Sequence, residues 1–121
     1  MNFNEKEDFS QFGKSFQENL CQLILLDRVF ADQMMEILDI NFLELNYLQV
    51  FARRIFDYKT KYKMHPSVEI MTTILRADIS EENSLTQKQV RDFFARMMRT
   101  SVQDTEYIQD TAVDFCKKQI L

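Results

Sequence analysis

Apolar residues recur at intervals of three and four along most of this chain, which is the spacing of an amphipathic helix. The clearest stripe follows Thr86 and predicts a helix with one face in a core. That stripe consists of Val90, Phe93, Phe94, Met97 and Met98. The same spacing predicts further helices that begin near Ser15, Asp27, Leu45, Ser67 and Asp104.

Residues that cap helices stand at most of these starts, and a proline marks one end. The long third helix is predicted to end before Pro66, because proline pushes the preceding residue, His65, out of the α region. Capping boxes are expected at Ser15–Glu18 and Thr86–Gln89, and single caps at Asp27, Ser67 and Asp104.

The composition favours the same fold class. The 121 residues include one glycine and one proline, too few for the turns of a sandwich or a barrel. Apolar residues make up 45%, which is enough for a single core. We predict an all-α fold, a compact bundle of about six helices. Residues 1–14 are predicted to form a flexible N-terminal arm, residues 15–103 a helical head, and residues 104–121 a last helix.

The last helix carries apolar residues on more than one side. One row is Ile108, Ala112 and Phe115, and the other is Val113, Cys116 and Ile120. Two interpretations stay open: a central helix buried on both sides, or a helix shared with a partner subunit. No glycine, asparagine or proline closes the pattern, so we expect the chain to be a piece of a longer protein.

Charge is distributed unevenly along the sequence. The net charge is −4, which excludes a uniformly basic DNA-coating protein. Residues 51–76 nevertheless hold six bases and two acids, with Tyr58 and Tyr62 interleaved. This basic patch is interpreted as a solvated helix face, a weak DNA contact or a docking site for an acidic protein. Its candidate residues are Arg53, Arg54, Lys59, Lys61 and Lys63.

We find no pattern typical of an active site. Gly13-Lys14-Ser15 resembles the end of a phosphate-binding loop, but Asp8 stands where that loop needs a glycine. His65 is the only histidine, which excludes sites that need two. The sequence therefore predicts a non-enzymatic chain with no catalytic residue, cofactor or metal site.

Two further features concern the compartment. Cys21 and Cys116 each lie in a helical apolar pattern, and we interpret them as reduced core thiols of a cytoplasmic protein. No apolar run approaches the ~20 residues of a membrane span, and the polar start of the chain does not resemble a signal peptide. No membrane contact is expected.

The order of these segments resembles a known family. The strings FADQMMEIL, FLELNYLQVFARRIFDYKTKYKMHPS and EYIQDTAVDFCKKQIL follow one another as in the N-terminal domain of phage DnaB-like hexameric replicative helicases. The segment from Phe51 to Ser67 resembles the helix-turn-helix in the middle of that helical head. The segment from Tyr107 to Leu121 resembles the first half of the family's helical hairpin.

The resemblance implies a function for the whole protein. The head forms part of a collar above the motor ring, hairpins of neighbouring subunits pair to help the hexamer form, and a DnaG-type primase docks on the collar. ATP and magnesium belong to a C-terminal RecA-like motor that has no counterpart in this sequence. We hypothesise that the last helix makes the contact between subunits, through Ile108, Phe115, Cys116 and Ile120.

Two alternatives stay open. A stand-alone phage adaptor or inhibitor could bind a host protein through the same apolar rows. A small helical DNA-binding module could use the basic patch of Arg53, Arg54, Lys59, Lys61 and Lys63. DNA contact by a collar domain is expected to be weak or absent.

Overall fold

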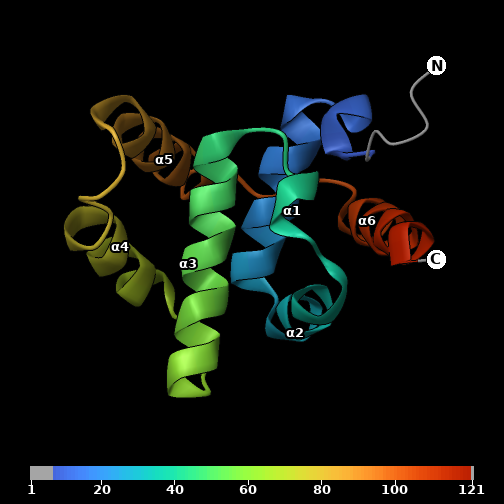
Figure 1. Ribbon diagram of the computed structural model, residues 1–121, viewed down its shortest axis with the longest axis horizontal. Coiled ribbons are helices and arrows are strands. Elements are labelled where there is room, and N and C mark those ends of the chain that lie inside the picture. The colour runs from blue at the N-terminus through green and yellow to red at the C-terminus, as the bar shows by residue number, and fades with distance from the viewer. Residues whose placement is uncertain (1–6, 121) are drawn as a thin grey trace.

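The computed structural model describes residues 7–120, and every regular element in that range is a helix (Figure 1). The predicted all-α fold with six α-helices is confirmed. The α-helices are α1 (Lys14–Leu26), α2 (Arg28–Ile37), α3 (Asn46–Tyr62), α4 (Val68–Ala77), α5 (Ser84–Met97) and α6 (Thr105–Ile120). Two short 3-10 helices, η1 (Phe9–Phe12) and η2 (Ile40–Phe42), complete the described part.

Helices α1 and α3 lie side by side at the centre of the fold. In Figure 1, α4 and α5 flank one side of this pair, while α2 and α6 flank the other. α1 contacts α2, α3 and α6, whereas α4 packs mainly against α5. The last helix is therefore part of the same core as the head, because α6 closes over α1 and α2.

Single caps were easier to predict than capping boxes. The Asp27 carboxylate accepts from the Phe30 amide at 3.0 Å, and the Ser67 hydroxyl accepts from the Ile70 amide at 3.1 Å, both as expected. Both predicted capping boxes are wrong, because α1 starts at Lys14 after Gly13 and α5 starts at Ser84 after Asn83.

Each misplaced start has a local physical reason. Gly13 has a φ of 89°, which side-chain-bearing residues rarely adopt, so the turn from η1 into α1 occurs there and Ser15 is already helical. The Asn83 side chain accepts from the Thr86 amide at 2.8 Å. Thr86 is buried instead, and its hydroxyl accepts from the Asn46 side chain at 3.3 Å.

The segment predicted as a flexible N-terminal arm, residues 1–14, includes the 3-10 helix η1. Residues 1–6 lie outside the described residues, whereas η1 packs against the core and Phe9 is fully buried. The Phe9 ring lies 4.8 Å from the Phe115 ring and 6.1 Å from the Phe42 ring. Aromatic packing therefore docks the part of this segment that the structure describes.

An ion pair at the edge of the core, together with a tyrosine hydroxyl, links α1, α3 and α5. Glu18 on α1 accepts two hydrogen bonds from the Arg96 guanidinium on α5, each 2.9 Å long, and one from the Tyr47 hydroxyl on α3 at 2.7 Å. The bonds from Arg96 are the main reason that the pKa of the Glu18 carboxyl lies below its ordinary value of 4.5.

This ion pair predicts a pH dependence of stability. Because the folded-state pKa of Glu18 is depressed, its stabilising effect is present above about pH 4.5 and is lost as the pH falls through the folded-state pKa. At neutral pH, Glu18→Gln should lower the free energy of unfolding by about 1–3 kcal/mol. Urea denaturation at about pH 7 and about pH 3 should show that this difference shrinks in acid.

The control for this prediction is Glu36→Gln, since Glu36 is exposed on α2. It should leave the free energy of unfolding within about 0.5 kcal/mol of wild type at both pH values. If Glu18→Gln lowers the free energy of unfolding as much in acid as at neutral pH, the substitution acts through side-chain packing and not through the lost charge.

Candidate functional site

A hollow of about 480 Å³ lies where α2 meets the end of α3 and the turn into α4. Cationic, apolar and polar side chains share its walls. Its lining consists of Arg28, Asp32, Met35, Lys59, Lys63, Met64 and His65. None of the other hollows described below combines an excess of cations with exposed methionines.

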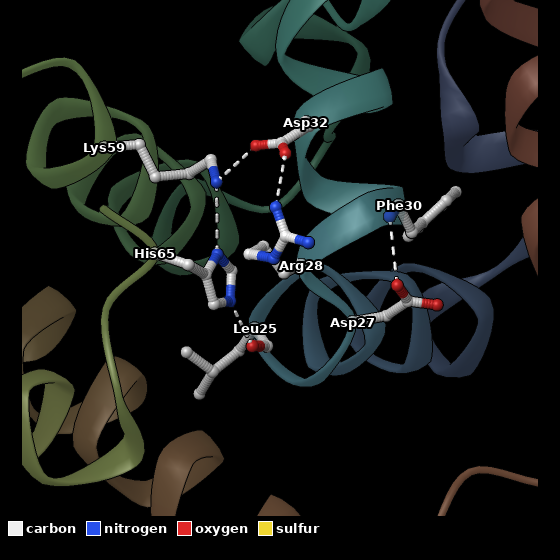
Figure 2. A network of polar contacts seen from close by, with 7 residues as sticks. All are labelled: Leu25, Asp27, Arg28, Phe30, Asp32, Lys59 and His65. Atoms are coloured by element: carbon white, nitrogen blue, oxygen red, sulfur yellow. Dashed lines mark hydrogen bonds and ion pairs between the residues drawn. The ribbon is translucent and has the colours of Figure 1, made fainter. Parts of the chain in front are cut away.

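The hollow is lined by Lys59 of α3 and by residues 63–65 of the turn after it, which face α2. Lys63 ends α3 in the left-handed conformation, with φ 57°, and its amide donates to the Lys59 carbonyl at 2.9 Å. The chain then passes through His65 and the buried Pro66 into α4. The His65 Nε2 atom lies 2.5 Å from the Leu25 carbonyl oxygen near the end of α1, as Figure 2 shows.

Lys59 is the centre of the polar network in Figure 2. It is only 8% exposed, yet its ammonium lies 2.5 Å from Asp32 Oδ1 and 3.3 Å from His65 Nδ1. A burial this deep is tolerated because the charge is paired and hydrogen-bonded. The hydrogen bond from Lys59 is also the main cause that lowers the pKa of the Asp32 carboxyl.

Both ring nitrogens of His65 have partners in this network. An ammonium only donates hydrogen bonds, so Nδ1 of His65 accepts from Lys59. A carbonyl only accepts, so Nε2 of His65 donates to Leu25. This geometry suits binding and positioning better than proton transfer to a substrate, because both nitrogens are engaged within the chain.

The hollow carries an excess of positive charge. Arg28, Lys59 and Lys63 face a single carboxylate, Asp32, on a chain whose net charge is −4. The guanidinium of Arg28 lies 3.6 Å from Asp32, and both side chains are mostly exposed, so this second ion pair is weak. The arrangement can therefore accept an anion beside two methionine side chains.

A second groove, of about 340 Å³, runs between α3 and α4. The Tyr58 and Tyr62 rings are in contact, tilted by 43° with centroids 4.7 Å apart, and the Lys61 ammonium lies 5.3 Å from the centroid of the Tyr62 ring. The lining of this groove contains two cations and two carboxylates, so their charges cancel. The lining consists of Arg54, Asp57, Tyr58, Lys61, Tyr62, Ile70, Thr73, Ile74 and Asp78.

The predicted basic patch is split between surfaces, which corrects the expectation of one patch. Lys59 and Lys63 line the hollow beside α2, while Arg54 and Lys61 line the groove beside α4. Arg54 is also paired with Glu81, and Arg53 is exposed. Residues clustered in the sequence of a helix are spread around its axis, and the four-residue spacing from Lys59 to Lys63 was the signal for a shared face.

Two further hollows, of about 270 and 340 Å³, lie elsewhere. One lies between α1 and α5 beside the Glu18–Arg96 ion pair, and the other lies between α2 and α6 beside Gln33 and Lys117. Neither contains an exposed large apolar residue in its lining.

The residues expected to make the contact between subunits are mostly core residues, which is a further correction. Ile108, Phe115 and Cys116 on α6 are buried within the chain, and only Ile120, 63% exposed, is free for a partner. Ala112 in the first row is fully buried, and Val113 in the second row is partly buried. α1, α2 and the Phe9 ring pack against α6 and bury these side chains, which the sequence alone did not reveal.

The two cysteines are buried and free, as predicted. Burial raises the pKa of the Cys21 thiol far above its ordinary value, and raises that of Cys116 to about 12. Both thiols are therefore protonated and unreactive at neutral pH.

Comparison of the chain with the models of known protein families, with curated proteins and with solved structures finds no match. Within residues 7–120, no group of three or more His, Cys, Asp or Glu side chains could hold a metal ion. In the same range, no helix combines the length and the apolar character that crossing a membrane requires.

Proposed function

We propose that this chain is a protein-docking domain, the collar domain of a DnaB-like replicative DNA helicase that acts in the cytoplasm. In this proposal the domain binds neighbouring subunits and a DnaG-type primase, and ATP-driven unwinding belongs to a motor outside this chain. The sequence strings quoted above and the all-helical head support this assignment.

One observation carries the docking function. Exposed large apolar side chains gather around the end of α3 and the start of α4, where Tyr62, Met64 and Ile70 lie next to the groove or the hollow. Apolar groups beside two surface depressions are typical of protein-binding surfaces. The same segment resembles the helix-turn-helix of the family's head.

The buried rows of α6 change the expected role of that helix. Since Ile108 and Phe115 are core residues, α6 is left with exposed side chains such as Ile120 for a subunit contact. In this proposal α6 is still the first half of a hairpin, but the α3–α4 region is the main docking surface. We rank the DNA-binding alternative lower, because Lys59 and Lys63 line the hollow whereas Arg54 and Lys61 line the groove.

The test is a titration of the chain with the DnaG-type primase encoded in the same genome. Wild type should bind, and Tyr62→Ala together with Ile70→Ala should weaken the Kd by about tenfold or more, as for anchors of an interface. The control is Leu85→Ala, because Leu85 is similarly exposed but lies on α5 away from the groove. A wild-type chain that fails to bind the primase would contradict the proposed partner.

A further inference from the structure

We infer that the hollow between α2 and the α3–α4 turn is a docking site for an acidic, apolar segment of a partner protein. Arg28 and Lys63 pair with a carboxylate of that segment, and Met35 and Met64 contact the apolar side chain beside it. The inference rests on the proposed protein-docking function and gives the chemistry of one site, whichever protein supplies the segment.

The first argument is the charge that remains after internal pairing. Lys59 and Asp32 neutralise each other at 2.5 Å. Arg28 keeps only its weak contact with Asp32 at 3.6 Å, and Lys63 has no ion-pair partner among residues 7–120. Two cations thus remain at the rim of one hollow on an acidic protein, which makes the site complementary to an anion.

The second argument is that part of the site is held in place before any ligand arrives. Two of the three N–H bonds of the Lys59 ammonium point to Asp32 and His65, and His65 is fixed in turn to Leu25. Lys59 is more than nine-tenths buried and lines the hollow, and an ammonium has a third N–H besides these two. In this inference that N–H donates to the incoming carboxylate. A pre-organised donor loses little entropy on binding.

The third argument separates a peptide from a nucleic acid. Met35 and Met64 are 37% and 64% exposed and share the hollow with the cations. Methionine is a flexible, polarisable group that adapts to apolar partners, and it adds nothing to phosphate binding. A nucleic acid would also need many phosphate contacts, whereas the hollow offers two free cations on a chain of net charge −4.

The experiment is a selection from a displayed library of random peptides of about twelve residues against the whole chain. Enriched peptides should carry Asp or Glu beside Leu, Met or Phe. A synthetic peptide from that set should bind the double variant Arg28→Ala/Lys63→Gln about tenfold more weakly than it binds wild type. A peptide in which Asn or Gln replaces the acidic residues should likewise bind wild type about tenfold more weakly than the acidic peptide does. Lys63→Gln introduces no new backbone strain, because both residues bear a side chain.

The matched control is Lys118→Ala, since Lys118 forms an i,i+4 ion pair with Asp114 that is exposed to a similar degree as the Arg28–Asp32 pair. This variant should bind the peptide as wild type does. The inference is overturned if nothing is enriched, if enriched peptides lack acids, or if the double variant binds them unchanged. The inference is also overturned if the double variant binds a single-stranded oligonucleotide more weakly than wild type does but binds every peptide as wild type does.

Failure of this inference and failure of the proposed function are distinguishable. The primase titration depends on Tyr62 and Ile70 in the α3–α4 groove, and the peptide selection depends on Arg28 and Lys63 in the hollow. A primase that binds while the selection fails would leave the collar proposal intact and remove the acidic docking site.

Discussion

Replacing Phe115 by alanine is expected to lower the free energy of unfolding by about 3–5 kcal/mol. The Phe115 ring is at the centre of an aromatic cluster, with ring centroids 4.8 Å from Phe9, 5.4 Å from Phe42 and 5.9 Å from Phe12. Alanine would leave a cavity bordered by three rings from η1 and η2, and these rings cannot collapse into it without moving η1. Because domains of this size are stable by only about 5–15 kcal/mol, the loss is large.

The measurement is urea denaturation monitored by circular dichroism, with sedimentation velocity on the same samples. Ile120→Ala is the matched control on the same helix and should change the free energy of unfolding by less than about 0.5 kcal/mol. Phe115→Leu keeps most of the volume and should cost less than alanine, so the prediction can be tested even if the alanine variant does not fold. An oligomer that dissociates without any loss of stability in Phe115→Ala would instead make this residue part of an interface.

Removing the partner of a buried charge is expected to have the second largest effect. Asp32→Ala should lower the free energy of unfolding, because the Lys59 ammonium then keeps only His65 as a partner. The loss should be smaller than for a fully buried pair, because the Asp32 side chain is 52% exposed and water can replace part of its interaction. Lys59→Met removes the charge together with its desolvation cost and should change stability by less than about 1.5 kcal/mol.

These two variants form a double-mutant cycle. In a Lys59→Met background, Asp32→Ala should cost little, so the interaction energy of the pair should account for most of the cost of Asp32→Ala in wild type. Chemical denaturation of the four proteins at neutral pH measures this value. Equal effects of Asp32→Ala in both backgrounds would mean that Asp32 stabilises the fold without its ion pair to Lys59.

The helices could be predicted from the sequence because their signals are local. Apolar spacing located all six, and Asp27 and Ser67 mark their own helix starts through side-chain bonds to an amide three residues on. The boxes at Ser15 and Thr86 failed because a residue just before each of them, Gly13 or Asn83, already provided the start. Spacing alone does not distinguish between two neighbouring capping residues.

The environment of α6 could not be predicted because its cover comes from irregular segments. Phe9 lies in a stretch that is mostly polar, and Phe42 lies in a short connector, so neither belongs to a periodic pattern. Both rings nevertheless pack on Phe115. Two apolar rows on one helix therefore did not distinguish a contact with the chain's own termini and loops from a contact with another subunit.

The candidate site could be predicted only in part. The cations of α3 were visible as a cluster, but their division between two surfaces depends on the rotation of the helix. The partners of His65 and Lys59 outside α3 and its exit were not visible, because Leu25, which contacts His65, and Asp32, which pairs with Lys59, come from the first two helices and reach the site only through tertiary packing.

The left-handed backbone at Lys63 has a consequence for protein engineering. Helices commonly end with glycine in this conformation, and a residue with a side chain costs about 1–2 kcal/mol there. A consensus or thermostabilisation protocol would therefore choose glycine at this position and obtain a domain with a higher free energy of unfolding. The same substitution would remove Lys63, one of the two cations that we propose to bind a partner's carboxylate. A screen for heat tolerance alone would therefore select variants that lack this cation.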